Sequence, residues 1–403
     1  MAESHASGLL DGVELWDGHE HRGRVRIRWS DGIVEVVESG ASTTGEALSV
    51  IPGLVDTHVH LDVPVADGRP ADLGWGTVTG QAEQSLHVLG NALRFAQNGV
   101  TTLRDMWSHA PQFAAARALR ERVLPGPRLL ANGPVGMTAG HGDLFTPHGV
   151  SDRPPTADGV DECRRLVRRW ARDGADGIKI YTSGGILSMG DEVGWRNHTL
   201  AETEAIIDEA HALGKRVGAH ALNAEGIDIA LAVGVDSIQH GTGLLPRHVD
   251  ELLARALPIA PTLLVHESIL RDTDPRREEA RRQTAPIVAH RDENFAAAAS
   301  RGVRFVLGTD ANGRLVPYDG AQEELRRMRD LFGWSDERAL IAGTSDAAAS
   351  LGLGDVTGTV AAGYSADLLI VRGRPWEDLG ALTTDRLVAV VARGRVLSGV
   401  LPG

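Results

Sequence analysis

The sequence predicts an α/β protein in which a (β/α)8 barrel carries a small β-sandwich domain. Three observations support this fold class. The chain has 403 residues, more than a single domain usually contains. Between Thr101 and Ala311 short apolar runs alternate with longer amphipathic segments, a pattern typical of βα units around a parallel sheet. Both ends of the chain instead alternate apolar and polar residues, as half-buried strands do. A doubly wound open sheet is the competing topology for the central part.

Eight short apolar runs are the predicted barrel strands, and eight is the number that closes such a barrel. Each run is brief and is bounded by Gly or Pro. In chain order they cover residues 50–58, 99–105, 128–133, 177–183, 216–221, 237–241, 258–264 and 303–310.

The segments between these runs have the spacing of helices. In residues 199–213 the apolar positions recur every three or four residues, and Thr199 followed by Glu202 has the spacing of a capping box. Residues 272–291 mix many arginines with acidic residues, which is typical of a solvated outer helix.

The two ends of the chain are predicted to meet in one small domain. Residues 25–37 alternate around Asp31 and Gly32, a dipeptide that favours a tight hairpin. Residues 367–371 and 387–396 also have the pattern of strands. We therefore expect residues 1–50 and 354–403 to form the β-sandwich domain, and residues 51–353 to form the barrel.

Composition excludes several classes of protein. Lys and Arg number 41 against 54 Asp and Glu, a formal charge of −13, which disfavours nucleic acid and anionic membranes as partners. Cys163 is the single cysteine, so no intrachain disulfide can form. The first residues lack the pattern of a secretion signal, and no apolar run is long enough to span a bilayer. We expect a soluble, cytoplasmic protein.

A pair of histidines marks the first candidate site. His58 and His60 follow an apolar run that begins near Pro52, and side chains at positions i and i+2 of a strand share a face. Imidazole is the commonest metal ligand, and barrel enzymes keep their sites at the carboxyl ends of the strands. The pair therefore predicts a metal site.

Three further predicted strands end in side chains of the same kind, namely His220, His240 and Asp310. Lys179 lies inside the apolar strand of residues 177–183, where a charged ammonium is strongly disfavoured. An ion pair inside the barrel is one explanation. The other is that burial lowers the pKa of Lys179, so that the neutral amine adds carbon dioxide and becomes an anionic ligand for two metals.

With these motifs the chain resembles the binuclear amidohydrolase superfamily. The match rests on Pro-Gly-X-X-Asp-X-His-X-His, the strand lysine, the two later histidines and Gly-Thr-Asp. Gly140-His141-Gly142 and Ser183-Gly184-Gly185 resemble the imidazolonepropionase-like branch, which includes Xaa-Pro and Xaa-Arg dipeptidases.

The resemblance implies a role for each candidate residue. His58, His60 and Asp310 would hold one divalent ion and His220 and His240 a second, with Lys179, N-carboxylated by CO2, bridging both. Zinc is the expected ion, with manganese, cobalt or iron as alternatives. Asp310 would also move the proton of an attacking hydroxide that bridges the two metals.

Three residues are expected to contact a small-molecule substrate: His141, Tyr181 and Arg314. His141 resembles a substrate-contacting and catalytic histidine of the branch, Tyr181 shares a strand face with Lys179, and Arg314 could clamp a carboxylate. Trp75, Trp107 and Trp195 could line an apolar pocket. Arg104 is expected to form an ion pair between layers of the barrel. Leu222 stands where many relatives carry a polar aromatic residue, so recognition of a substrate carboxylate in the dipeptidase manner does not follow.

The sequence therefore predicts a metal-dependent hydrolase of amide-type C–N bonds in dipeptides, N-acyl amino acids or cyclic amides. Lactone, ester, carbamate or urea hydrolysis on the same site is the alternative. A deaminase and a non-enzymatic scaffold are more distant ones, because Lys179 favours two metals and all six ligand positions are filled. A homo-oligomer fits the resemblance.

Overall fold

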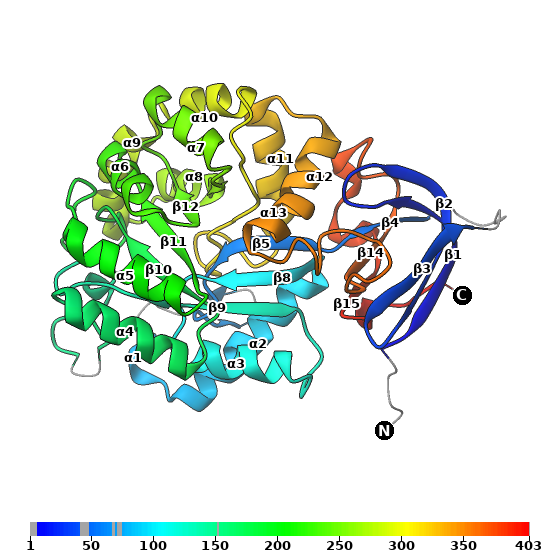
Figure 1. Cartoon of the computed structure of the whole chain (residues 1–403), viewed down its shortest axis with the longest axis horizontal. Coiled ribbons are helices and arrows are strands. Elements are labelled where there is room, and N and C mark those ends of the chain that lie inside the picture. Colours follow the sequence, from blue (N-terminus) through cyan, green and yellow to red (C-terminus); the bar gives the residue numbers. More distant parts are fainter. Residues whose placement is uncertain (1–5, 41–47, 67–68, 71–74, 151–152, 403) are drawn as a thin grey trace.

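The computed structural model describes residues 6–40, 48–66, 69–70, 75–150 and 153–402. Two sheets organise the chain: a barrel that is surrounded by helices, and a second sheet that is built from both ends of the chain and stands at one side of it (Figure 1).

The barrel contains seven strands in the order β13-β12-β11-β10-β9-β8-β5, and all neighbours are parallel. They are β5 (Leu54–Val59), β8 (Val100–Asp105), β9 (Arg128–Pro134), β10 (Gly177–Tyr181), β11 (Arg216–Ala221), β12 (Ser237–His240) and β13 (Ile259–Ala260). Nearly every residue in them is buried. Burial on both faces explains their continuous apolar runs.

Residues 303–311 close the barrel as an eighth extended segment. Phe305 forms a parallel bridge with Ile259 on one side, and Ala311 forms one with Val59 on the other. The amide of Asp310 also donates to the carbonyl of His58 at 2.8 Å. The predicted (β/α)8 barrel is therefore confirmed, although its last segment pairs through single bridges instead of a regular ladder.

The helices lie outside the strands (Figure 1). They are α1 (Trp75–Val78), α2 (Gln81–Gln97), α3 (Ala110–Arg120), α4 (Val160–Asp173), α5 (Leu200–Ala212), α6 (Ala224–Val233), α7 (Val249–Ala254), α8 (Leu263–Arg271), α9 (Glu278–Val288), α10 (Arg291–Ser300), α11 (Ala321–Phe332), α12 (Asp336–Gly343) and α13 (Ser345–Ser350). Short 3-10 turns cover Asp143–Phe145, Pro246–His248, Pro275–Arg277, Leu379–Ala381 and Thr384–Arg386. The predicted capping box is present at the start of α5, where Thr199 and Glu202 bond reciprocally.

One predicted strand is shorter than expected. Residues 258–264 were expected to be extended, but β13 ends at Ala260 and α8 begins at Leu263. Thr262 adopts a left-handed backbone with φ +47°, which turns the chain directly from the strand into the helix. A short apolar run does not show such a turn, because Leu suits a buried helix start as well as a buried strand.

The second sheet has the order β16-β15-β14-β4-β1-β2-β3. The three strands from the carboxyl end therefore lie on one side and the four from the amino end on the other, and the two groups meet where β14 pairs with β4. Its strands are β1 (Gly8–Trp16), β2 (His21–Ser30), β3 (Ile33–Ser39), β4 (Leu48–Pro52), β14 (Leu368–Arg372), β15 (Leu387–Ala392) and β16 (Arg395–Gly399). A separate pair, β6 (Val65–Ala66) and β7 (Arg69–Pro70), is antiparallel. The sheet encloses its own apolar cluster, which includes Leu15, Ile27, Trp29 and Ile370.

Two tight turns in this sheet explain its hairpins. Asp31 and Gly32 both have positive φ, +50° and +84°, so the hairpin that their sequence predicts is confirmed. Arg393 and Gly394 form a second such turn, with φ +49° and +79°. Residues 387–396, expected to be extended throughout, are therefore divided between β15 and β16.

The barrel has one end free of the second sheet. β4 ends at Pro52 and β5 begins at Leu54, so the amino end of β5 lies beside the second sheet and its carboxyl end points away. Because the barrel strands are parallel, all their carboxyl ends meet at the free end. Across the described residues, each helix is too short or too polar to traverse a lipid bilayer.

Candidate metal centre

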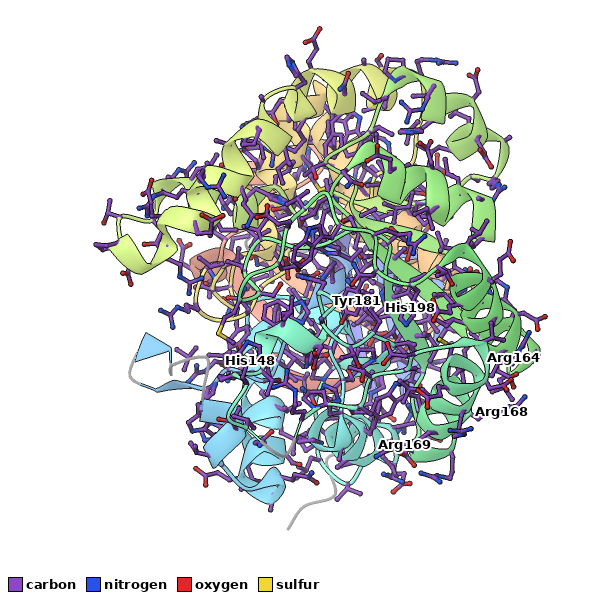
Figure 2. The ribbon with its side chains drawn as sticks, turned by 90° about the vertical axis from the view of Figure 1, so that its left-hand side faces the viewer. His148, Arg164, Arg168, Arg169, Tyr181 and His198 are labelled. Carbon is purple, nitrogen blue, oxygen red and sulfur yellow. The ribbon has the colours of Figure 1, made fainter. Side chains whose placement is uncertain are left out.

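The carboxyl ends of the strands form the face that Figure 2 shows, with Tyr181 near its middle and Arg164, Arg168 and Arg169 of α4 at its edge. The arginines of α4 pair with acidic groups: Arg164 contacts Asp208 at 2.6 Å, for example.

His58, His60 and Asp310 meet at one point of this face. The Nε2 atom of His60 lies 3.0 Å from Oδ1 of Asp310, and that of His58 lies 3.6 Å from the same oxygen. One ligand atom each from His58, His240 and Asp310 lie within 4.8 Å of one another. These three side chains could hold a metal ion, and they come from three different strands or segments of the barrel.

His220 and His240 adjoin this group. Their rings are 4.7 Å apart, and the ring of His240 is 5.0 Å from that of His58. Lys179 is buried and lies close enough for its charge to lower the pKa values of His58, His220 and His240. The structure therefore brings together all six side chains that the sequence singled out as ligands.

Hydrogen bonds from neighbouring groups orient three of the rings. Nδ1 of His58 lies 2.9 Å from Oε1 of Gln239, and Nδ1 of His240 lies 2.8 Å from Oγ1 of Thr262. Nε2 of His220 donates to the carbonyl of Gly184 at 3.1 Å. Each ring therefore keeps its other nitrogen free to bind a metal, an arrangement common among metal-ligating histidines.

Burial keeps these groups in the protonation states that a metal requires. It lowers the pKa of His58, His220 and His240 well below the ordinary value, and the charge of Lys179 acts in the same direction. Burial also lowers the pKa of Lys179 to about 7, against the opposing charge of Asp310. Neutral imidazoles bind cations, so the residues present fit divalent metal ions.

His60 behaves differently because it lies beside a carboxylate. Burial opposes its charged form, but the hydrogen bond and the charge of Asp310 raise the pKa of His60 overall. His60 is also more exposed, at 21% against 1% for His58. The opening of the site therefore lies on the side of His60 and Asp310.

His141 joins the cluster from a loop. Its ring stacks on that of His220 at 4.4 Å, and its Nδ1 contacts Ser188 and Asp191, both at 2.8 Å. A Cβ added to Gly185 would come within 1.7 Å of the ring. The Ser183-Gly184-Gly185 turn therefore leaves room for His141.

Tyr181 and Trp107 form an aromatic wall with Phe145 beside His141. Trp107 meets Phe145 edge-on at 4.9 Å, and His141 lies 5.0 Å from Phe145 and 5.2 Å from Tyr181. The hydroxyl of Tyr181 is buried without a hydrogen-bond partner. This wall covers one side of the cluster.

The other predicted residues differ in their positions. Arg314 is partly exposed in the loop after Asp310, where its amide donates to Asn312. Trp75 contacts His87 in the region of α1 and α2, and Trp195 is 48% exposed. The structure does not bring these two tryptophans into the ring cluster described above.

Arg104 corrects an expectation. It was expected to form an ion pair, but it donates to the carbonyl of Thr57 at 2.7 Å and to Ser237 at 3.3 Å. The carboxylate of the neighbouring residue, Asp105, accepts hydrogen bonds from the backbone amides of Leu61 and Trp107. Adjacent residues of a strand point to opposite faces, so Arg104 and Asp105 have different partners.

Sequence reasoning missed four buried residues around the cluster: Gln239 and Thr262, which bond to candidate ligands, Asp191, which bonds to His141, and His266. Gln239 directly precedes His240 on β12, and its side chain reaches His58 on β5, a strand that does not pair with β12. Only the closed barrel brings these two side chains together. His266 is buried in α8 with its ring 5.8 Å from that of His240. It is the single histidine of α8 and follows three apolar residues, so no motif or spacing in the sequence indicated that it lies near the candidate ligands.

Comparison with known proteins identifies the family. A model of the Amidohydrolase family matches residues 49–400. The chain belongs to the amidohydrolase family. Ochratoxinase from Aspergillus niger is 27% identical over 366 residues, which cover 86% of this chain and 74% of that protein.

This amidohydrolase is also similar to an imidazolonepropionase and to a Xaa-Pro dipeptidase. Imidazolonepropionase from Acidiphilium cryptum is 25% identical over 370 residues, covering 86% of this chain and 84% of that protein. A crystal structure of a Xaa-Pro dipeptidase with methionine bound in the active site superposes with a TM-score of 0.85 at 27% identity, covering 98% of this chain and 100% of that one. The resemblance to the dipeptidase-like branch is confirmed, and this amidohydrolase is a hydrolase.

Proposed function

We propose that this amidohydrolase is a binuclear metal-dependent hydrolase that cleaves an amide-type C–N bond. The observation that carries the proposal is the convergence of His58, His60, His220, His240 and Asp310 around buried Lys179. The family to which the chain belongs supports the same reaction class.

In this proposal His58, His60 and Asp310 would hold one divalent ion, His220 and His240 would hold the second, and N-carboxylated Lys179 would be a ligand of both. Nitrogen and oxygen donors favour zinc. Two such ions supply Lewis acidity, which acidifies water and polarises a carbonyl. The lowered pKa of Lys179, about 7, supports a neutral amine that can react with CO2.

Asp310 and His141 supply the proton transfers and the orientation of the substrate. Asp310 lies at the open side of the cluster, where a carboxylate can accept a proton from the attacking water and pass it to the leaving amine. Nδ1 of His141 donates to the Asp191 carboxylate at 2.8 Å. In the doubly protonated ring, which that carboxylate favours, Nε2–H would donate to the substrate carbonyl oxygen.

The aromatic wall supports a preference for substrates with an apolar or aromatic group. Trp107, Phe145 and Tyr181 lie next to His141, and aromatic rings bind apolar groups through large contact areas. Arg314, in the loop after Asp310, is the candidate for holding a substrate carboxylate. The names Xaa-Pro dipeptidase and imidazolonepropionase put dipeptides and cyclic amides among the first compounds to test.

The test combines metal analysis with a substrate panel. Chelator-treated protein is reloaded with Zn²⁺, the bound metal is counted, and hydrolysis is measured on dipeptides, N-acyl amino acids, cyclic amides, lactones, carbamates and ureas. We expect about two ions per chain and the highest kcat/KM on an amide with an apolar or aromatic group. Fewer than two ions, or turnover confined to lactones, carbamates or ureas, would contradict the proposal.

A further inference from the structure

Thr262 has a backbone conformation that a β-branched residue rarely adopts. Its φ is +47° and it is fully buried. A β-branched residue is strained in this region, and such strain persists only where the surroundings impose it. His240 and Asp310, at the ends of the strand segments on either side, also have positive φ, +65° and +54°.

The hydroxyl of Thr262 reaches the ligand cluster. Its Oγ1 lies 2.8 Å from Nδ1 of His240. A neutral ring that offers Nε2 to a metal carries its proton on Nδ1, which can donate to this oxygen. The carbonyl of Thr262 also accepts from Nδ1 of His266 at 3.1 Å, so the residue contacts two histidines at once.

Glu324 of α11 holds the chain directly after Thr262. Its two carboxylate oxygens accept from the amides of Leu263 and Leu264, at 2.6 and 3.0 Å. These are the first amides of α8, which have no partner within the helix. Glu324 is 0% exposed, and a buried carboxylate at a helix amino end is favoured by the helix dipole. The bidentate bond fixes where α8 starts, and therefore the conformation of Thr262.

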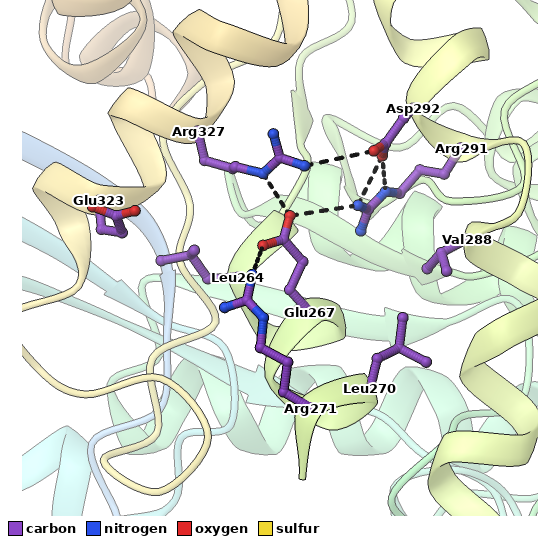
Figure 3. A pocket seen from close by; sticks show the side chains of 9 residues that line it. All are labelled: Leu264, Glu267, Leu270, Arg271, Val288, Arg291, Asp292, Glu323 and Arg327. Carbon is purple, nitrogen blue, oxygen red and sulfur yellow. Dashed lines mark hydrogen bonds and ion pairs between the residues drawn. The ribbon is translucent and has the colours of Figure 1, made fainter.

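A second contact docks α8 on α11 without touching Thr262. Arg327 donates to Glu267 at 2.6 Å, at the rim of a pocket of about 360 Å³ on the outside of the barrel (Figure 3). Arg271 reaches the same carboxylate at 2.9 Å. Arg327 follows Glu324 by three residues on the same face of α11. The two side chains have different partners on α8, so a substitution can remove one contact and leave the other in place.

We propose that Thr262 and Glu324 are positioning residues for His240: Glu324 fastens the start of α8, which holds Thr262 in its left-handed conformation with its hydroxyl on Nδ1 of His240. This inference rests on the proposed metal centre. Such supporting bonds fix the ring orientation and the tautomer of a ligand. Thr262 and Glu324 therefore set how tightly the ion at His240 is bound.

The test measures metal affinity independently of turnover. Metal-free wild type and variants are titrated with Zn²⁺ against a chromophoric chelator, which yields a dissociation constant for each ion. Thr262→Val removes the hydroxyl at nearly constant shape, and we expect one of the two constants to weaken by about 10- to 100-fold. Thr262→Ser keeps the hydroxyl and should restore binding to near wild type.

Thr262→Val could fail to fold, because valine is strained at the positive φ of this position. Two further variants test the same inference without it. Thr262→Gly adopts that conformation without strain and should lose the same affinity. Glu324→Gln keeps the shape but offers one acceptor for two amides, and it should weaken the same ion.

Arg327→Met is the matched control. It removes the ion pair between Arg327 and Glu267, so it should lower the unfolding temperature and leave both metal constants unchanged. Wild-type constants in Thr262→Val and Thr262→Gly would overturn the inference, as would equal losses in Arg327→Met. Absence of a second ion from wild type would instead refute the proposed binuclear centre.

Discussion

In three of the site histidines one ring nitrogen forms a hydrogen bond within the protein and the other is available to a metal. One nitrogen of His58, His220 and His240 meets Gln239, Gly184 and Thr262 respectively, and the other remains for a metal. The partners are neutral oxygen atoms, and burial lowers the pKa of each of these rings well below the ordinary value, although Asp310 lies 3.6 Å from His58. His60, which has Asp310 at 3.0 Å, is the exception.

Lys179→Ala tests the bridging role. Loss of an anionic ligand between two cations should weaken metal binding and lower kcat by at least about 100-fold. Short carboxylic acids such as acetate should restore part of the activity, because they supply two oxygens where the carbamate would lie. The readout is kcat with and without the acid, and full activity in the unsupplemented variant would exclude the bridge.

Gly185→Ala tests the placement of His141. The new methyl group would come within 1.7 Å of the His141 ring, so the ring must leave its stack on His220. We expect kcat to fall by roughly 10- to 100-fold, the usual range for a displaced acid–base or polarising group, with little change in the number of bound ions.

Gly194→Ala serves as its control in the same loop region. A Cβ at Gly194 meets nothing within 4 Å, so activity should remain at the wild-type level. If both variants were equally active, His141 would have no role at its present position.

At the scale of elements, the ends of strands and helices place the chemistry. His58, Tyr181, His220 and His240 lie within a residue or two of the end of β5, β10, β11 and β12. His240, at the end of β12, and Asp310 both have positive φ. Residues 303–311, which carry Asp310, pair with their neighbours through single bridges and not through a regular ladder. Short turns after parallel strands therefore bring side chains from distant parts of the sequence to one face.

Thr199→Ala tests a cap at this scale. Thr199 caps α5, and Glu202 of the same box also accepts from the amide of Gly159 before α4 at 2.6 Å. Removal of a threonine cap costs about 1 kcal/mol. Urea unfolding should show this loss of stability while kcat stays at the wild-type value, because the cap lies outside the ligand cluster. A fall in kcat instead of stability would contradict this account.

At the scale of the whole molecule, the barrel and the second sheet are joined by buried contacts. β4 of the second sheet runs into β5 of the barrel. Arg128 of β9 lies 3.1 Å from Asp367, which is 1% exposed and also accepts from Thr357 and from the amide of Arg393. We propose that the two units meet near residues 50 and 354, and these contacts hold them together.

Buried histidines make the stability of the metal-free protein depend on pH. Burial lowers the pKa of His109 and of His266 to about 4, and Nε2 of His109 is fully covered. The unfolded chain takes up these protons near pH 6.5, so it binds more protons than the folded chain between pH 6.5 and 4. Stability should therefore fall as the pH falls through this window, by up to about 1.4 kcal/mol per pH unit for each histidine.

Urea unfolding of the metal-free protein at pH 7, 6 and 5 measures this slope. His109→Asn, which does not titrate, should reduce the slope between pH 6 and 5. A stability that does not change from pH 7 to pH 5 would contradict the prediction.

Much of the architecture and all six candidate ligands could be predicted from the sequence. Strands of a barrel are buried on both faces, so they appear as apolar runs, and His58, His220, His240 and Asp310 stand out at their ends. Lys179 stood out because a cation is rare within such a run.

What the sequence by itself determined was therefore the set of candidate ligands and the strands that bear them. Only the tertiary structure decided which groups support them. Gln239 reaches His58 across 181 positions, and Glu324 reaches the start of α8 across 61. These contacts arise from strand order and helix docking, and neither leaves a local pattern in the chain. The same reason explains why the turn at Thr262 was missed: its backbone is imposed by bonds to His240, to His266 and after it to Glu324, all of them formed through folding.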